Sequence, residues 1–535
     1  MNFALRRLFS TTVLKKDTNQ ALDLGKYAIN FLEKGNPSSK VLERSKMFHT
    51  DSVICGLSAL ALKCNAPHVL RDEALEFTLP KTTKIEHARV FGSNELVPIE
   101  KAIVANSSAV REWDSNGTVF GYANEKTRQA GEFGHNDFYP VVVAASFVNP
   151  KITGSLALKA MVLQDEIRGR LCEVFSLKSY KIDHVVHGGI ASICTYGALV
   201  GASPEQIEHA IGMLVAHYIP WRAIRAGKQL SDSKGASAAI TTEAAIMCIK
   251  RAMRGFVGPK DIFRNPEAIF RYFEKTNGTS PFDITLSNEG DDFAVMGMHF
   301  KLGLYEHQSA GALEGLQKMV YETKFAAEHS INDIENINIV AYEPAFGIIG
   351  DPAKKTPSTR QSADHSMVYI VSTILRKAFE TRDLLSKLQG FKNLDGVWKM
   401  LMLEPKDYGH QALFNKQTRD LMAKCTFTHG GPEYDAKYPE GIPTSISVTL
   451  KGGKKYDSGF VMFPSGHSRN NTANLREILD YKNNLLGKLA LSESELSEKL
   501  ALLNNIESAS NKDLQNLYNC KINVRKHSVD TAEFT

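Results

Sequence analysis

The chain has 535 residues, of which 43% are hydrophobic and 23% charged, so it can bury a large core and is not mainly disordered. Its 64 lysines and arginines exceed its 59 acidic residues by five, and four of the basic residues lie within the first twenty positions. The remainder is nearly neutral, which argues against a nucleic-acid partner, because nucleic-acid binders gather their basic excess on one domain.

The seven cysteines are spread along the chain, and no two lie closer than nine positions. Iron–sulfur clusters and structural zinc sites are usually held by closely spaced cysteines, and no CxxC pair occurs. We therefore expect no iron–sulfur cluster and a reducing compartment. The longest apolar runs, such as the one at 141–147, are shorter than the ~20 residues that cross a bilayer, so we expect no membrane partner.

Residues 1–20 are typical of a mitochondrial presequence. They carry Arg6, Arg7 and several hydroxyl residues between scattered apolar side chains, and no acidic residue precedes Asp17. The apolar run is too interrupted for a secretory signal. We expect this segment to direct the protein to the mitochondrial matrix; the alternative is a disordered basic tail.

From residue 21 to about 287 the apolar pattern is helical. A helix of small and apolar residues ends at Gly201, and Ser203, Pro204 and Gln206 predict the capped start of the next helix. The stretch 234–253 is rich in alanine, which favours close packing of helices. This segment is expected to form the first part of a large helical domain.

The pattern changes between residues 288 and 461, which we expect to form a smaller α+β lid domain. The β-branched run 337–342 predicts a strand, and 445–450 and 458–463 predict a hairpin around the glycine turn 451–454. A helix is expected at 367–379.

Helical periodicity returns from about Ala473, where leucines recur at spacings of three and four. We expect residues 462–535 to return to the first domain. The predicted fold class is therefore α+β: a large all-helical domain with a smaller α+β lid domain inserted before the C-terminal helices.

The usual nucleotide, zinc-protease and hydrolase motifs are absent from the sequence. Instead, five segments place histidine, lysine, arginine and acidic residues beside glycine: 111–137, 182–189, 221–237, 300–308 and 463–469. Each alone has an ordinary explanation, such as a helix cap or a buried histidine. Together they suggest a cationic pocket for a polycarboxylate or a phosphate. Asp114 and Thr118 are four apart, which predicts that they share one helix face.

In this order, the segments resemble the 2-methylcitrate dehydratase (PrpD/MmgE) family over residues 24–469. The resemblance rests on Asp114 with Thr118, on Gly134-His135-Asn136-Asp137, on Asp183-His184-Val185, and on the later lysine, histidine and arginine segments, including 363–365 with Tyr369. It implies a homodimeric hydro-lyase without a metal cluster, in which a helical domain carries an α+β lid. Such an enzyme dehydrates 2-methylcitrate to 2-methyl-cis-aconitate in propionate breakdown. The presequence adds the expectation of a fungal mitochondrial form.

The resemblance also implies the site residues. Those expected to be catalytic are His135, His184, Asp114, Lys234 and Lys301. Those expected to bind the tricarboxylate are Thr118, Arg222, Arg225, His307, His467 and Arg469. No resident cofactor or metal is expected, although a weakly bound divalent cation is compatible with the carboxylates.

The chemistry suits these residue types. Dehydration takes a proton from the carbon beside a carboxylate and expels a tertiary hydroxyl, so it needs a base, an acid and cations for the carboxylates. Without clustered cysteines, a side chain must protonate the leaving hydroxide. The sequence leaves open which of His135 and His184 is the base.

Two alternatives remain. A cis-aconitate decarboxylase, or a related tricarboxylate lyase or epimerase, would use the same fold, but segments 347–350 and 362–365 depart from the decarboxylase pattern and agree better with the dehydratase one. The remote alternative is a non-catalytic helical binding protein.

Overall fold

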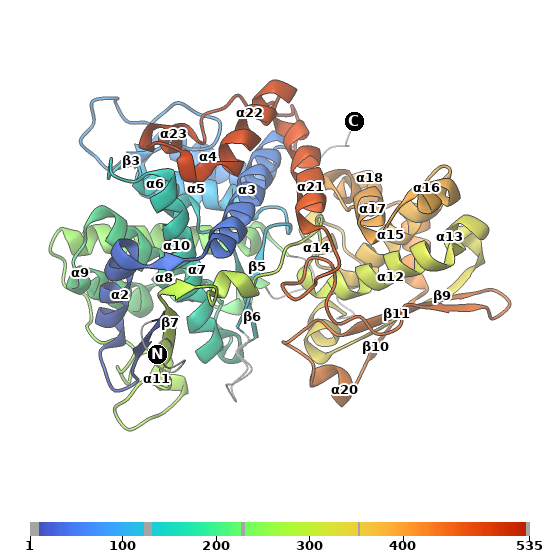
Figure 1. Ribbon diagram of the computed structural model, residues 1–535, viewed down its shortest axis with the longest axis horizontal. Helices are drawn as coiled ribbons and strands as arrows, with labels where there is room; N and C mark the ends of the chain where they lie inside the picture. Colours follow the sequence, from blue (N-terminus) through green and yellow to red (C-terminus); the bar gives the residue numbers. More distant parts are fainter. Residues whose placement is uncertain (1–9, 122–130, 226–229, 351–353, 531–535) are drawn as a thin grey trace.

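The computed structural model describes residues 10–121, 131–225, 230–350 and 354–530, with only the backbone for 118–121, 131–135 and 348. The chain forms two lobes (Figure 1). The first is mostly helical, and the second combines helices with a sheet, which confirms the predicted α+β class.

The first lobe is built around long buried helices. Its helices are α2 (Gln20–Lys34), α3 (Ser39–Ala61), α4 (Asn65–Glu76), α5 (Ile99–Arg111), α6 (Pro140–Ala145), α7 (Gly154–Val174), α8 (Val185–Val200), α9 (Pro204–His217), α10 (Asp232–Met253) and α11 (Ile269–Phe273). Helix α8 is buried on almost all sides. It approaches Phe138 so closely that a Cβ at Gly188 would lie 2.0 Å from that ring, which explains the glycine at this position.

The predicted boundary between α8 and α9 is confirmed. Gly201 ends α8 in the left-handed conformation at φ +89°, which glycine adopts without steric cost. Ser203 then caps α9: its hydroxyl accepts from the Gln206 backbone, and the Gln206 side chain accepts from the Ser203 backbone. Local sequence alone therefore determines this turn.

Short two-stranded pairs bind the surface segments of this lobe together. The strands are β1 (Thr11–Leu14) with β7 (Ile284–Ser287), β2 (Asn36–Pro37) with β8 (Glu289–Gly290), β3 (His87–Ala88) with β4 (Val97–Pro98), and β5 (Thr118–Gly121) with β6 (Gly131–His135).

Strand β1 lies inside the segment predicted as a presequence. It pairs antiparallel with β7, from Thr11 opposite Ser287 to Leu14 opposite Ile284, and the Leu14 side chain is buried. The Gln20 side chain donates to the Leu14 and Phe282 carbonyls. Residues 11–20 thus pack on the fold in the full-length chain, and their removal remains a prediction.

The second lobe is organised around a sheet with strand order β10-β9-β11-β12. The strands are β9 (Ile334–Ala341), β10 (Cys425–His429), β11 (Thr444–Leu450) and β12 (Lys455–Asp457). Strand β10 runs parallel to β9, and the other pairs are antiparallel. Buried and partly exposed residues alternate along β9, as expected for a sheet with one face on the core. The first strand and the glycine turn of the predicted hairpin are confirmed, and Gly452 and Gly453 turn it with positive φ, but the second strand is Lys455–Asp457 and not 458–463, because the tight turn lets the chain pair again at once.

Helices lie along the sheet of the second lobe (Figure 1). They are α12 (Ala310–Thr323), α13 (Phe325–Glu328), α14 (Arg360–Ala363), α15 (Met367–Glu380), α16 (Leu384–Gly390), α17 (Leu394–Leu401), α18 (His410–Leu413), α19 (Lys416–Ala423) and α20 (Pro432–Asp435). The predicted helix at 367–379 is α15.

The C-terminal helices are α21 (Leu475–Ala490), α22 (Glu493–Asn504) and α23 (Asn511–Asn516). Helices α21 and α22 pack against α3 of the first lobe, and α21 also contacts α17 of the second. Figure 1 shows α21 between the two lobes. The last segment of the chain therefore links them.

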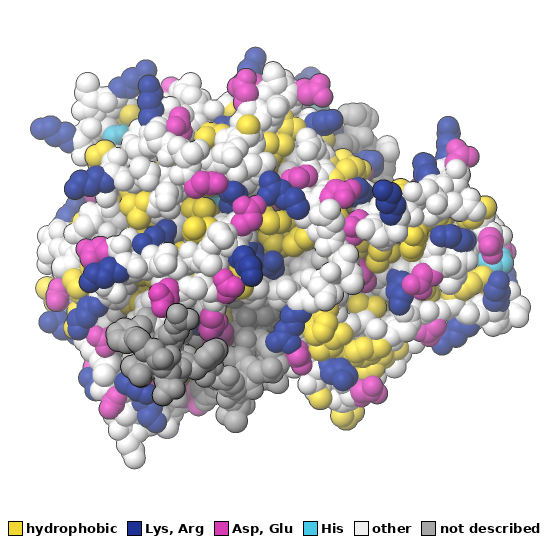
Figure 2. Space-filling view, in the orientation of Figure 1, with side chains coloured by type: hydrophobic (Ala, Val, Ile, Leu, Met, Phe, Trp, Pro, Cys, Tyr) yellow, Lys and Arg dark blue, Asp and Glu magenta, His cyan; other side chains and the backbone are white. Residues whose placement is uncertain are grey.

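The surface and the helix lengths bear on possible partners. On the face in Figure 2, lysine and arginine side chains alternate with acidic ones instead of gathering into one basic patch. Among the described residues, no helix is by itself long and apolar enough to span a membrane; the bent pair α3 and α4, at 87°, passes that test by length and composition only.

Candidate active site

Asp114 lies at the centre of a buried cluster of charges contributed by both lobes. Its carboxylate contacts the Lys301 ammonium and lies 3.2 Å from Lys234 Nζ, 3.3 Å from an Arg111 nitrogen and 2.8 Å from His365 Nε2. Burial alone would raise the pKa of Asp114, but these positive charges outweigh it and hold that pKa well below its usual value.

Different elements position these groups. Arg111 ends α5, Lys234 lies in the first turn of α10, and Lys301 precedes the 3-10 turn His307–Ser309. His365 lies just before α15. Helix α5 ends before Asp114, so the predicted helical turn from Asp114 to Thr118 is wrong: Thr118 begins strand β5. The Asp114 and Ser115 segment is held by the second lobe, because Tyr305 donates its backbone N–H to the Asp114 carbonyl at 3.1 Å.

A second carboxylate, Asp364, completes the cluster. His365 Nδ1 lies 2.5 Å from Asp364 and 3.2 Å from Lys234 Nζ, and Lys234 lies 3.7 Å from the Asp364 carboxylate. The imidazole of His365 therefore bridges two carboxylates. Burial lowers the pKa values of Lys234 and Lys301, although Asp114 opposes the shift in each case.

His184 forms a neighbouring group with two arginines. It lies at the start of α8, and its Nδ1 is 3.7 Å from Asp183, whose carboxylate pairs with Arg225. Arg222 and Arg225 are the first and last residues of one 3-10 turn. Burial lowers the pKa of His184 well below its usual value, and Asp183 only partly opposes this. His184 is therefore a neutral imidazole at pH 7.

The two groups are electrostatically connected. The charge of Arg111 acts on the pKa values of both Asp114 and His184, and the charge of Arg225 acts on that of Lys234. Because such effects fall off with distance in a protein, the predicted residues Asp114, Lys234, Arg225 and His184 share one region of the interior.

The backbone places Thr118 opposite His135 in the β5 and β6 hairpin. Both side chains lie outside the described residues. The adjoining Asp137 is described: Asn116 donates to it at 2.5 Å, and Arg111 lies 3.7 Å away. The residues that flank the hairpin, Asn116 and Asp137, therefore contact the Asp114 cluster through Arg111.

His307 and His467 lie on either side of a third histidine, beside the Asp114 cluster. His299 lies between them, with ring centroids 4.9 Å from His307 and 3.9 Å from His467. Burial, followed by the charge of Lys301, lowers the pKa of His307, and burial lowers the pKa of His467 to about 3. These imidazoles are therefore neutral. Arg469, by contrast, is 40% exposed and pairs with Glu440.

Two groups of possible metal ligands converge in the described part of the chain. They are Asp114 with Asp364 and His365, and Cys64 with Glu112 and Asp530. Each group already faces positive side chains. In the first group these are Lys234 and Lys301. In the second, Arg360 pairs with Glu112 and Asp530. A metal ion would have to displace these cations, so neither group fits a resident metal well.

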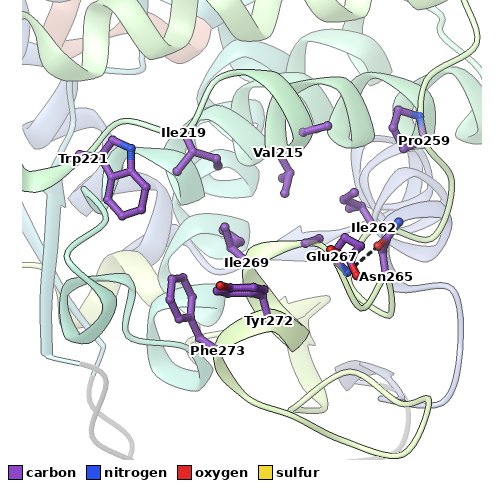
Figure 3. A pocket seen from close by; sticks show the side chains of 12 residues that line it. Val215, Ile219, Trp221, Pro259, Ile262, Asn265, Glu267, Ile269, Tyr272 and Phe273 are labelled. Carbon is purple, nitrogen blue, oxygen red and sulfur yellow. Dashed lines mark hydrogen bonds between the residues drawn. The ribbon is translucent and has the colours of Figure 1, made fainter.

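Two cavities lie near these groups. One, of about 520 Å³, lies beside Trp221, next to the turn that carries Arg222 and Arg225; apolar side chains line most of it, and none of its lining residues is basic (Figure 3). It therefore does not suit a tricarboxylate. The other, of about 490 Å³, is lined by Asp232 of α10 and by Arg360, Tyr408 and Asp530.

Sequence reasoning did not single out Arg111 and His365 as site residues. Arg111 lies in the same charged segment as Asp114, but helix α5 ends at Arg111, so no helical spacing marks the pair in the sequence. His365 was visible only as part of the family resemblance, because its contacts with Asp114 join residues 251 positions apart.

Known proteins resemble this chain over most of its length. Residues 23–281 match the family described as the MmgE/PrpD N-terminal domain. The chain is 23% identical to the 2-methylcitrate dehydratase of Escherichia coli K12, over 87% of this chain and 90% of that protein. It is 22% identical to the probable 2-methylcitrate dehydratase of Saccharomyces cerevisiae, over 80% and 78%. It is 23% identical to the mitochondrial 2-methylcitrate dehydratase of Yarrowia lipolytica, over 67% and 63%.

Proposed function

We propose that this chain, whose residues 23–281 match the MmgE/PrpD N-terminal domain family, is a hydro-lyase that dehydrates 2-methylcitrate to 2-methyl-cis-aconitate in propionate breakdown. The observation that carries the proposal is the buried carboxylate of Asp114, surrounded by Arg111, Lys234, Lys301 and His365. The names of its relatives support the same reaction.

The charge pattern supports a substrate with several carboxylates. Buried cations are costly unless anions face them, and Arg111, Lys234 and Lys301 all lie against the single carboxylate of Asp114. Asp137 and Asp364 are the nearby anions. A tricarboxylate that enters this region would share Lys234, Lys301 and the arginines with Asp114. Arg222 and Arg225 would bind a further carboxylate, in the paired geometry that arginine favours.

The pKa shifts suggest the division of chemical roles. His184 is neutral because burial lowers its pKa, so it can accept the proton from the carbon beside a substrate carboxylate. Lys234 and Lys301 carry ammonium groups beside Asp114; they would stabilise the developing enediolate and donate the proton that turns the leaving hydroxide into water. The double bond forms as the C–H and C–O bonds break. His135, opposite Thr118 in the hairpin, is the second candidate for proton transfer.

The two lobes suggest how the substrate is enclosed. Asp114, Lys234 and His184 come from the first lobe, whereas Asp364 and His365 come from the second. We propose that the second lobe acts as a lid whose closure completes the site and excludes water. We also propose that the enzyme acts in the mitochondrial matrix, and the mitochondrial relative supports the organelle. That it is a homodimer is proposed from the family resemblance alone.

We further propose that the reaction needs neither an iron–sulfur cluster nor a bound metal. The support is chemical: the seven cysteines are unclustered, and lysine ammonium groups lie where a metal would meet the carboxylates. Activity should therefore survive chelators and anaerobic removal of iron. Oxygen-sensitive activity that ferrous iron and sulfide restore would contradict this.

An assay of the purified protein tests the function. The protein is given 2-methylcitrate isomers, citrate or cis-aconitate, and the new double bond is followed by its ultraviolet absorbance. Rising absorbance with 2-methylcitrate is expected. Release of CO₂ from cis-aconitate would instead indicate the related decarboxylase, and no reaction with any of these acids would indicate a binding protein.

A further inference from the structure

A lysine of the last long helix reaches the candidate active site from the side of α3. Lys482 lies on α21, and its side chain is completely buried. Its ammonium lies 2.7 Å from Asp51 of α3 and donates to the carbonyl oxygens of Ser115 at 2.6 Å and Lys301 at 3.0 Å. These three acceptors match the three N–H groups of a lysine ammonium.

The two carbonyls belong to the segments that meet at Asp114. Ser115 is the next residue after Asp114, and the side chain of Lys301 contacts the Asp114 carboxylate. Lys482 thus joins the backbones behind both partners of one ion pair. The same segments also meet where Ser115 Oγ donates to the Gly303 carbonyl at 2.7 Å. Lys482, from helix α21, adds a contact to both segments that neither segment supplies itself.

Stability alone is a weak explanation for this arrangement. A buried ion pair often contributes little, and apolar residues of similar size can replace one with little loss. Here the ammonium also makes two hydrogen bonds to the backbone, and both lead to the same place in the site. A small shift in the position of a catalytic group can reduce turnover by about 10²-fold.

We propose that Lys482 is a positioning residue: it holds the Asp114 and Lys301 backbones at the separation that keeps the Lys301 ammonium at the reacting region. This inference rests on the proposed function, because it assigns Lys482 a role in turnover. It makes helix α21 part of the active site, although the helix follows the whole second lobe in sequence.

The alternative is that Lys482 only neutralises Asp51, and matched variants separate the two roles. Asp51→Asn removes the charge of the partner and leaves both backbone hydrogen bonds in place. The double variant Asp51→Asn with Lys482→Met removes the hydrogen bonds as well, without leaving a buried unpaired charge. Lys488→Met, on the exposed side of the same helix, is the control.

For each variant, kcat and KM for 2-methylcitrate are measured, together with thermal unfolding and amide hydrogen exchange of residues 111–117 and 300–306 without substrate. We expect Asp51→Asn and Lys488→Met to keep kcat within about threefold. The double variant should lose about 10- to 100-fold in kcat, with a smaller change in KM and faster exchange in both segments. A folded double variant with wild-type kcat and exchange would overturn the proposal.

Should the double variant not fold, Lys482→Arg takes its place. It keeps the charge opposite Asp51 but presents a planar guanidinium to the three acceptors, so the same loss of kcat is expected, and a wild-type kcat would contradict positioning. Should the wild-type protein not act on 2-methylcitrate, the proposed function fails. The exchange of the two segments then still decides whether Lys482 positions them.

Discussion

The Nε2 atom of His365 lies 2.8 Å from the Asp114 carboxylate, so a residue of the second lobe completes the group of side chains around a carboxylate of the first. Both side chains are largely buried. Any movement that separates the lobes at this point would change the charge balance of the cluster.

Asp114→Asn should destabilise the protein strongly. The substitution keeps the size of the side chain but leaves Arg111, Lys234 and Lys301 without their shared anion, and loss of one partner of a buried ion pair costs about 3–5 kcal/mol. Urea unfolding measures this change. Citrate should restore more stability to the variant than to the wild type, since its carboxylates replace the lost charge. Asp283→Asn, at an ion pair with Lys15 that is half exposed, is the control and should cost under about 1 kcal/mol.

His184→Gln should reduce kcat by about 10²- to 10⁴-fold, the size expected for a general acid or base, with little change in the melting temperature. His187→Gln, one turn further along α8, is the matched control. His187 makes a 3.0 Å hydrogen bond with the Phe175 carbonyl, so its loss should lower stability more than turnover. Equal losses of kcat in the two variants would argue against a role for His184 in proton transfer.

Stability should fall in mild acid because several buried histidines are neutral. Burial lowers the pKa of His49 to about 3, and neither of its ring nitrogens has a hydrogen-bond partner among the described residues. The unfolded chain binds a proton at this residue below about pH 6.5, but the folded chain does not until about pH 3. Stability due to His49 is therefore complete above pH 6.5 and is lost as the pH falls through this window.

His49→Gln should reduce the slope of unfolding free energy against pH by about 1.4 kcal/mol per unit between pH 6 and 4, the value for one proton. Urea unfolding at several pH values measures the slope. His217→Gln, on the surface, controls for the loss of a histidine as such. An unchanged slope in His49→Gln would show that His49 takes up its proton in the folded state.

The pairing of β1 with β7 predicts where the N-terminus can be shortened. A chain that begins at Ser10 keeps the strand and the buried Leu14, so it should melt like the full chain. A chain that begins at Gln20 loses both, and burial of a leucine side chain alone is worth about 1.5–3 kcal/mol. Thermal unfolding of the two truncations compares them, and the mass of protein recovered from mitochondria would show whether processing spares Thr11.

The sequence predicted the elements that depend on local chemistry. The Ser203 capping box and the Gly452-Gly453 turn need only neighbouring residues, and both are present. The course of the chain after Asp114 could not be predicted in this way. The carbonyl of the next residue, Ser115, is held by Lys482, 367 positions away, and such a contact overrides the helical spacing of Asp114 and Thr118.

For the site, the order of motifs identified Asp114, Lys234 and Lys301, which the structure brings together. It did not show that Arg225 is engaged by Asp183 or that Arg469 pairs with Glu440 near the surface. The partner of a charged side chain depends on the arrangement of distant segments, which a single sequence does not display.

The position of α21 in the chain has a consequence for synthesis on the ribosome. Helix α3 packs early against α5 and α7, but it receives another partner, α21, only after residue 475 has been translated. Until then the Asp51 carboxylate lacks its ion pair with Lys482, so this part of the first lobe reaches its final form only after the second lobe has been made. Nascent chains that stop within the second lobe would expose the apolar surface of α3, and we expect them to be held by chaperones or degraded.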